Sequence, residues 1–449
     1  MSENRPTVDS HVVLERVLER IDDGIEAEVR YTTGVESLTR FANSFIHQNV
    51  SEEVTTISLR VAVDGRVASG DGTVVTDDAI DRLVDETVVA AKLQPVDDEW
   101  PGVAKPAKLP VTEHWDDDTA DASPQVRAAK VKEFVDAGPS MRAAGYCSTS
   151  STEVFFVNTL GHFAAGRATS AILDGIHQTD SSAGSGHMMS QRLGDIDATS
   201  VGALAAQRAA DSVETFDLKP GEYEVVLSQE CVASIVVFLG VYGFNAKLHN
   251  EGMSFVNLGT QQFDESLSII DDALDDRGLM VPFDSEGVAR RRVELVTDGV
   301  TKGLAQDRRT AKKAGLESTG HAVPGAEGFG PIATQVFVAG GGLSVDEMIG
   351  GVERGLYIAT FNYCRVLDPK SLAVTGLTRN GTFMIENGKI TGAVNGLRFT
   401  QSFVDALGPG RIKGLGNDAR WADSEFDPGM VHAPSMHLTS WNFTGGTDG

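Results

Sequence analysis

The chain contains 449 residues, of which 64 are acidic and 38 basic, and its formal net charge is −26 at pH 7. A surface this negative repels phosphate backbones, so nucleic acid is excluded as an expected partner. A hydrophobic content of 41% and a charged content of 23% are typical of a folded globular chain and exclude wholesale disorder.

The first half of the chain switches between helical and strand patterns. Ser10 and Ser123 precede apolar residues at helical spacing and are expected N-caps, and Pro124 is suited to a first helical turn. Apolar and polar residues alternate in the strand segments, with expected breaks at "TTG" (32–34) and "DG" (64–65). In chain order we predict a helix over 10–21, strands over 26–50 and 55–70, a helix over 77–93, a surface connection over about 95–122, a helix over 123–138, strands over 152–176 and a helix over about 198–213.

The character of the sequence changes near Pro220, where we place a domain boundary. Beyond it, Gly, Asn and Thr become frequent, and short alternating segments with "TDG" and "ENG" turns occur over 290–300, 381–394 and 397–404. The predicted fold class is therefore α+β. Residues 1–219 are expected to form an α/β domain with an antiparallel sheet and flanking helices, and residues 220–449 a β-rich domain.

The most apolar stretch is "CVASIVVFLGVYGF", residues 231–244. It is shorter than the roughly 18 to 20 residues that cross a bilayer, so it predicts a buried helix and no membrane partner. The N-terminal sequence mixes charges with its apolar positions, unlike a secretory signal, and we expect a cytoplasmic protein. Three widely spaced cysteines form no CxxC pair and are expected to be reduced and buried.

Generic catalytic motifs such as HExxH, GxSxG and the P-loop do not occur in the sequence. His432 and His437 are five residues apart and would point to opposite faces of a strand, which argues against a shared metal ion. His177, Asp180 and His187 flank a flexible segment and form a loosely spaced candidate for a metal site.

Several segments resemble the TldD/PmbA family of zinc-dependent peptidases, in which a TldD-type subunit carries the metal and a TldE (PmbA)-type subunit does not. "FDSEGV" and "IENGKI", in that order and spacing, are the most specific matches. Similar segments are "SLTRFANSFIHQNVSEE" near the N-terminus, "GEYEVVLS" from Gly221, "GGVERGLYI" from Gly350 and the closing "APSMHLTSWNF". The resemblance implies a barrel-like C-terminal domain and two subunits that enclose a proteolytic chamber.

The resemblance also implies which subunit this chain is. In TldD-type subunits, the helix after the "VVL" strand carries HExxxH, whose places fall here on Val237, Phe238 and Tyr242. TldD-type subunits also supply a C-terminal cysteine, and none follows Cys364 here. The expected protein is thus a TldE-like subunit with no cofactor of its own. A TldD-like partner in a heterodimer would hold zinc and hydrolyse peptide or peptide-like amide bonds.

The segment "ESTGHAVPGAEGFG", residues 317–330, is the candidate substrate loop. Its glycines permit close approach of a ligand, and Gly320, His321 and Glu327 are the residues expected to contribute. On this hypothesis, His321→Ala impairs turnover without lowering the melting temperature. The alternative is a surface loop with incidental polar residues.

Two other functions stay open at this point. One is an independent zinc metallopeptidase with displaced ligands, such as His249 with Cys231 or Cys364. The other is a non-enzymatic peptide-binding scaffold, because a fold can persist without its activity.

Overall fold

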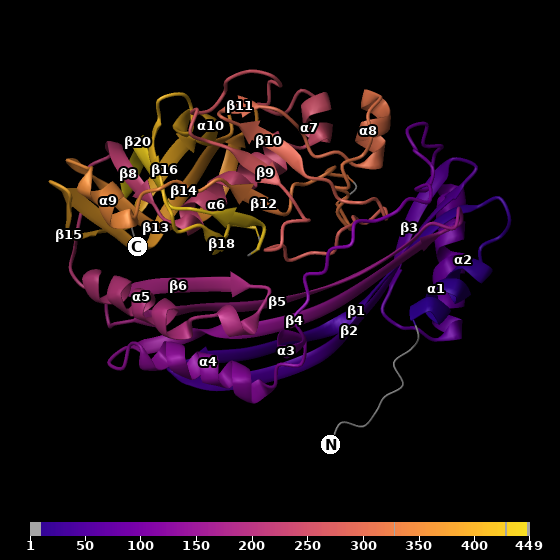
Figure 1. Ribbon diagram of the computed structural model, residues 1–449, viewed down its shortest axis with the longest axis horizontal. Coiled ribbons are helices and arrows are strands. Elements are labelled where there is room, and N and C mark those ends of the chain that lie inside the picture. The colour runs from indigo at the N-terminus through magenta and orange to yellow at the C-terminus, as the bar shows by residue number, and fades with distance from the viewer. Residues whose placement is uncertain (1–9, 327, 427–428, 447–449) are drawn as a thin grey trace.

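Figure 1 shows the protein as a computed structural model, which describes residues 10–326, 328–426 and 429–446. The N-terminal half forms one long, curved antiparallel sheet, and the C-terminal half lies on the inner side of the curve (Figure 1). The strand order in this sheet is β3-β2-β1-β4-β5-β6. The strands are β1 (Glu26–Ala42), β2 (Phe45–Val63), β3 (Arg66–Gly72), β4 (Arg142–Asn158), β5 (Phe163–Gln178) and β6 (Ala183–Ser190).

Strand alternation gives this sheet two different faces. In β1, Ala27 and Val29 pack into a core with α1 and α2, and Phe41 packs into a second core beneath α4 and α5. The even-numbered Glu28 and Glu36 lie on the opposite face, toward the C-terminal half. The helices of the N-terminal half are α1 (Ser10–Glu19), α2 (Asp77–Leu93), α3 (Asp117–Ala120), α4 (Pro124–Asp136) and α5 (Ala198–Asp211), with a 3₁₀ turn at Leu193–Asp195.

The predicted helices are confirmed, with small differences at their ends. The helix α2 has the predicted bounds, and α4 begins at Pro124 after Ser123. Ser10 lies inside α1, which ends two residues earlier than expected, at Glu19.

One expected break in the strands is wrong. The strand β1 runs straight through "TTG", because Gly34 allows a backbone approach that a side chain would block. A Cβ atom at Gly34 would lie 1.9 Å from the carbonyl oxygen of Ser151 on β4. The chain turns instead at Asn43 and Ser44, which adopt positive φ angles of 48° and 65°. The turn at "DG" joins β2 and β3 as predicted.

The C-terminal half contains two sheets. In the larger one, pairing runs in the order β13-β8-β20-β16-β14, and β13 also pairs with β14, so these strands close into a barrel. This sheet comprises β7 (Thr215–Phe216), β8 (Gly221–Leu227), β13 (Arg354–Asp368), β14 (Ala373–Glu386), β15 (Lys389–Val394), β16 (Leu397–Ser402), β17 (Ile412–Leu415) and β20 (Met436–Gly446). The smaller sheet comprises β9 (Ile269–Asp271), β10 (Val293–Thr297), β11 (Val300–Thr301), β12 (Val336–Val338), β18 (Arg420–Ala422) and β19 (Val431–Ala433).

This α+β architecture, with an antiparallel N-terminal sheet and a β-rich, barrel-like C-terminal half, confirms the predicted fold class. Strand β7 lies before Pro220 in the sequence but pairs with β15 of the C-terminal half. The position of the domain boundary therefore stays a prediction. The halves meet where β6 contacts β14 and β18. The C-terminal helices are α6 (Gln229–Phe238), α7 (Ala246–Asn250), α8 (Arg308–Ala314), α9 (Val345–Gly350) and α10 (Phe403–Ala406).

The apolar stretch of residues 231–244 forms most of α6 and the π-helical turn that follows it, Leu239–Gly243. Its side chains lie in the main core of the C-terminal half, between both sheets. The prediction of a buried helix is therefore confirmed. Within the described ranges, no helix is both long and apolar enough to span a bilayer.

Candidate functional site

A cleft of about 820 Å³ opens between the inner face of the N-terminal sheet and the C-terminal half. Its sheet wall carries Ser150 on β4, Ser170 and Ile172 on β5 and Met189 on β6. Its opposite wall consists of the turn after α6 and three loops, through Val241, Tyr242, Leu279, Met280, Val323, Gly325, Ala326, Phe329, Ile332, Thr334, Gln335, Phe426, Gly429 and Met430. Apart from Glu36, the described lining residues are apolar or neutral, so the cleft suits an uncharged, partly apolar ligand.

The cleft continues along the sheet as a shallower hollow of about 360 Å³. The two cavities share Glu36, Ser150, Ser170 and Ile172, and the hollow extends to Gln48, Val50 and Glu52 on β2. Strand β3 pairs only with residues 57–63 of β2, so among the described residues no strand covers the outer edge of residues 45–56. The cleft and the hollow together form a groove that runs from the end of α6 to an open strand edge.

The three positions that correspond to HExxxH lie at the end of α6 in different surroundings. Val237 and Phe238 are buried, and the Phe238 ring packs against Phe403 and Phe426, with ring centroids 5.9 and 5.0 Å away. Tyr242 is half-buried, stacks on Phe238 at 5.9 Å and reaches the cleft. Only one of these positions therefore faces a possible substrate.

These positions do not fit a zinc ion. Zinc in proteins takes imidazole, thiolate or carboxylate ligands. Val237 and Phe238 carry no ligand atom, and Tyr242 offers only a phenol. In the part of the chain that the structure describes, no group of three His, Cys, Asp or Glu side chains is placed to hold a metal ion.

The candidate substrate loop contributes to the cleft through Val323, Gly325, Ala326 and Phe329. Gly320 lies before this part, with a φ angle of +75°, and a Cβ atom there would lie 2.4 Å from the carbonyl oxygen of Ala289. A glycine is therefore required at position 320 for the shape of the loop. Glu327 lies outside the described residues.

His321 is fully buried and does not line the cleft. Its Nε2 lies 3.0 Å from Oδ1 of Asp271, and its Nδ1 lies 3.0 Å from the carbonyl oxygen of Thr319. Burial by itself would raise the pKa of Asp271, but the charge and hydrogen bond of His321, the charge of Arg290 and the hydrogen bond from the Gln335 N–H together hold that pKa below its ordinary value. The other oxygen of Asp271 accepts the backbone N–H groups of Thr334 and Gln335, at 2.8 and 3.0 Å. Thr334 and Gln335 line the cleft, so the buried His321–Asp271 pair holds part of the cleft wall in place.

This burial changes the expected effect of His321→Ala. The substitution leaves the Asp271 carboxylate without its partner in the interior, so we expect a loss of about 3 kcal/mol in the free energy of unfolding. Thermal denaturation followed by circular dichroism measures it, and His47→Ala, on an exposed part of β2, is the control. An unchanged melting temperature would favour the original expectation of a purely functional residue.

The "FDSEGV" segment holds the candidate loop in place. Oδ1 of Asp284 accepts the N–H groups of Glu286 and Val288, each at 2.9 Å, and Oδ2 accepts the N–H of Ala322 at 3.0 Å. Burial, then the charge of Glu286, raises the pKa of Asp284. Asp284 therefore connects a tight turn to the loop that lines the cleft.

A buried ion-pair cluster joins the two halves beside this turn. Arg60 on β2 donates through Nε to Glu28 on β1, at 2.6 Å, and through a second nitrogen to Glu286, at 3.2 Å. The second oxygen of Glu286 accepts the N–H of Arg308 at 3.0 Å. Burial raises the pKa of Glu28 to about 7, although the attraction of Arg60 opposes the shift.

We expect this cluster to make stability depend on pH. In the unfolded chain Glu28 loses its proton near 4.5, whereas in the folded protein it keeps it until about 7. Since the folded state binds more protons in this window, stability falls as pH rises from 4.5 to 7, by at most about 1.4 kcal/mol per pH unit. Urea denaturation of the wild type and Glu28→Gln checks this. The variant should show a flatter profile, and equal slopes would contradict the assignment.

The other candidate metal ligands do not come together. His177 is buried beneath α4, with Nε2 3.0 Å from the carbonyl oxygen of Phe134, whereas His187 lies on the opposite face, 3.2 Å from Asp174. Asp180 is exposed near Arg142. His432 packs between Phe337 and Trp421, and His437 bonds Glu224 at 2.6 Å.

The displaced-ligand alternative also lacks a suitable environment. Cys231 and Cys364 are buried, and burial raises the pKa of both thiols well above the ordinary value. A zinc ligand must be a thiolate, which these surroundings disfavour. His249 lies on α7 and is half-buried.

The sheet wall of the cleft was not predicted from the sequence. Ser150 and Ser170 are paired across β4 and β5, and their hydroxyl oxygens are 2.8 Å apart. The available signal was the uninterrupted row of hydroxyl residues from Ser148 to Thr152, of which Ser148 and Ser150 line the hollow. Such a row indicates a face that packs against something other than a helix.

Both protein-family models and curated proteins match this chain. The family model "PmbA/TldA metallopeptidase C-terminal domain" matches residues 220–445, and "PmbA/TldA metallopeptidase domain 1" matches residues 27–91. A "Metalloprotease" of Methanothermobacter thermautotrophicus is 26% identical over 50% of this chain and 49% of its own length. "Metalloprotease PmbA" of Escherichia coli O157:H7 is 27% identical over 53% and 50%, respectively. The matched region thus spans about half the length of these relatives.

A solved structure extends the likeness to the whole fold. The crystal structure of TldE from Thermococcus kodakarensis superposes with a TM-score of 0.86 and 17% identity, over 97% of this chain and 99% of that one. At this identity the similarity concerns the fold. The family match over half of the chain is the stronger finding, and by it the chain belongs to the PmbA/TldD family of metallopeptidases.

Proposed function

We propose that this chain is the non-zinc, TldE-like subunit of a two-subunit peptidase of the cytoplasm. It binds peptide or peptide-like substrates, and a TldD-like partner supplies zinc and hydrolyses the amide bond. One observation carries the proposal: the cleft at the end of α6 is lined, among the described residues, without any His, Cys, Asp, Lys or Arg side chain. Glu36 is the one carboxylate among the described lining residues. A single carboxylate does not complete a metal site, and these residues offer no imidazole base, so the lining suits substrate binding.

The groove supports the proposed substrate class. An extended peptide can bind through its main chain wherever a strand edge offers unpaired N–H and C=O groups. Residues 45–56 of β2 offer such an edge, and the hollow beside them leads to the cleft. Apart from two glutamates and two glutamines, the side chains along this path are apolar or carry a hydroxyl group, and they place few demands on the side chains of a substrate.

Reconstitution tests the proposal. The purified chain, its HExxxH-bearing homologue from the same organism and their mixture are each incubated with zinc and an unstructured peptide. We expect no hydrolysis by this chain alone and the highest rate in the mixture, with the two chains eluting together at one to one.

Elemental analysis separates the alternatives. Protein purified without added metal should contain less than stoichiometric zinc if the partner supplies the ion. Hydrolysis by the isolated chain, together with bound zinc, would contradict the proposal and favour an independent metallopeptidase. A mixture that gains no activity would favour a scaffold.

A further inference from the structure

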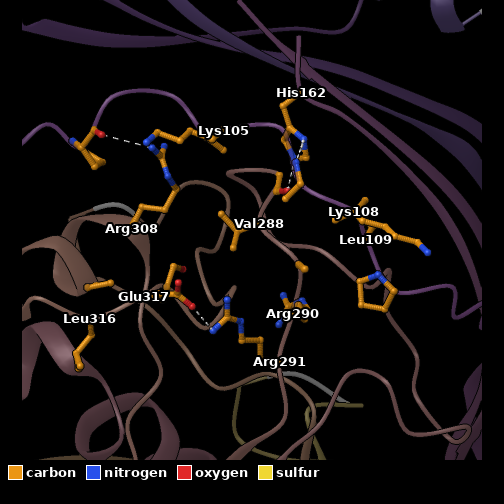
Figure 2. Close-up of a pocket in the computed structure, with 18 of the residues that line it drawn as sticks. Lys105, Lys108, Leu109, His162, Val288, Arg290, Arg291, Arg308, Leu316 and Glu317 are labelled. Carbon is orange, nitrogen blue, oxygen red and sulfur yellow. Dashed lines mark hydrogen bonds and ion pairs between the residues drawn. The ribbon is translucent and has the colours of Figure 1, made fainter. Parts of the chain in front are cut away.

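A second cavity, of about 880 Å³, lies away from the cleft, between the surface connection and the C-terminal half (Figure 2). One wall is the connection over residues 101–110. The other wall consists of residues 287–292 and the beginning and end of the segment 308–318, which contains α8. The cavity therefore exists only where segments from both halves meet.

The charge of this cavity is opposite to that of the chain. Its lining includes three lysines and four arginines, against a single carboxylate, Glu317. The whole chain has 26 more acidic than basic side chains. Placing like charges side by side costs electrostatic energy, and a bound anion offsets that cost. The concentration of cations thus indicates a site for an anion.

Two of these cations are accessible to a ligand, and two of the arginines carry a buried nitrogen without a hydrogen-bond partner among the described residues. Lys105 and Lys108, on the connection, are exposed and have no ion-pair partner among the described residues. Arg290 is only 5% exposed; its Nη1 donates to Oγ1 of Thr334 at 3.0 Å, and its Nε has no hydrogen-bond partner in the described part of the chain. The buried Nη1 of Arg308 is likewise without a partner there.

The only carboxylate in the lining holds one of the arginines. Figure 2 shows Glu317 directed at Arg291, and the two side chains are 2.8 Å apart. Both residues are exposed, so this pair contributes little to stability. An incoming oxyanion can replace Glu317 as the partner of Arg291.

The rest of the lining sets the size and nature of the ligand. Val103, Leu109, Val288 and Leu316 give the cavity apolar walls, and its volume lies in the range of small-molecule sites. Arginine forks bind phosphate and carboxylate groups through paired hydrogen bonds. We propose that this cavity binds a small organic anion with several phosphate or carboxylate groups. This site is independent of the proposed peptidase role.

Isothermal titration calorimetry of the full chain tests the site, with tripolyphosphate and citrate as probes. We expect saturable binding at one site that weakens as salt is raised. The double variant Lys105→Glu/Lys108→Glu should bind about tenfold more weakly or worse, because two attractions become repulsions. Tighter binding of tripolyphosphate identifies a phosphorylated ligand, and tighter binding of citrate identifies a polycarboxylate.

Two further variants make the test specific. Lys370→Glu/Lys389→Glu changes the charge equally at exposed sites elsewhere and should weaken binding by no more than about twofold. Glu317→Gln removes the internal competitor and should strengthen binding roughly threefold. Absence of saturable binding by the wild type, or equal weakening in both double variants, would overturn the proposal.

Discussion

Asp284→Ala is expected to lower the free energy of unfolding by about 3 to 5 kcal/mol, because it leaves three backbone N–H groups, two buried and one partly buried, without an acceptor. Those groups belong to Glu286, Val288 and Ala322, and Asp284 is only 2% exposed. The contact with Ala322 also ties the candidate substrate loop to the rest of the C-terminal half. Urea denaturation measures the loss, and limited proteolysis should show earlier cleavage within residues 317–330.

The exposed Asp276 provides a matched control, since Asp276→Ala removes the same side chain where no buried donor depends on it. We expect that variant to stay within about 0.5 kcal/mol of the wild type. Asp284→Asn keeps one carbonyl acceptor and should fall between the two. If Asp284→Ala were within 1 kcal/mol of the wild type, as an order-of-magnitude limit, the assigned role of this carboxylate would be refuted.

Phe238→Glu is expected to cost about 4 to 5 kcal/mol, although glutamate is the residue that the zinc motif would carry at this place. Phe238 is 2% exposed and packs among the rings of Tyr242, Phe403 and Phe426. A carboxylate there would be desolvated without a cationic partner, and the aromatic contacts would be lost as well. Thermal and urea denaturation both measure the effect.

Phe238→Leu is the control for volume and should cost at most about 2 kcal/mol, because it keeps an apolar side chain. The comparison shows whether the end of α6 has become an ordinary part of the core. A stable Phe238→Glu variant that gains zinc on dialysis would contradict this view, because it would show that the helix end still has room and polarity for a metal site.

Much of the fold was predictable because local signals and tertiary packing agree. The helix over residues 77–93 has apolar residues on one face, and it packs that face on the N-terminal sheet. The predicted break at "TTG" was wrong because glycine occurs in proteins for two different reasons. At Gly34 it permits close backbone approach within a strand, and a single sequence does not distinguish that purpose from a turn.

The candidate site was predictable only in part. The loop over residues 317–330 does supply cleft residues, but His321 points inward to Asp271, and polarity alone does not reveal the direction of a side chain. The basic cavity could not be foreseen, since Lys105 and Arg290 are distant in the sequence. The arginines at 290–292 resembled the beginning of a strand, and β10 does begin directly after them, at Val293.

The two-faced character of β1 restricts how the length of this chain can change. Core positions and cleft positions alternate from Ala27 to Phe41, so one inserted residue within the strand would exchange them. Glu36 would then enter a helix-covered interior while apolar side chains filled the substrate path. We expect insertions and deletions among homologous chains to be confined to hairpin ends such as Asn43–Ser44, where a change in length alters neither face.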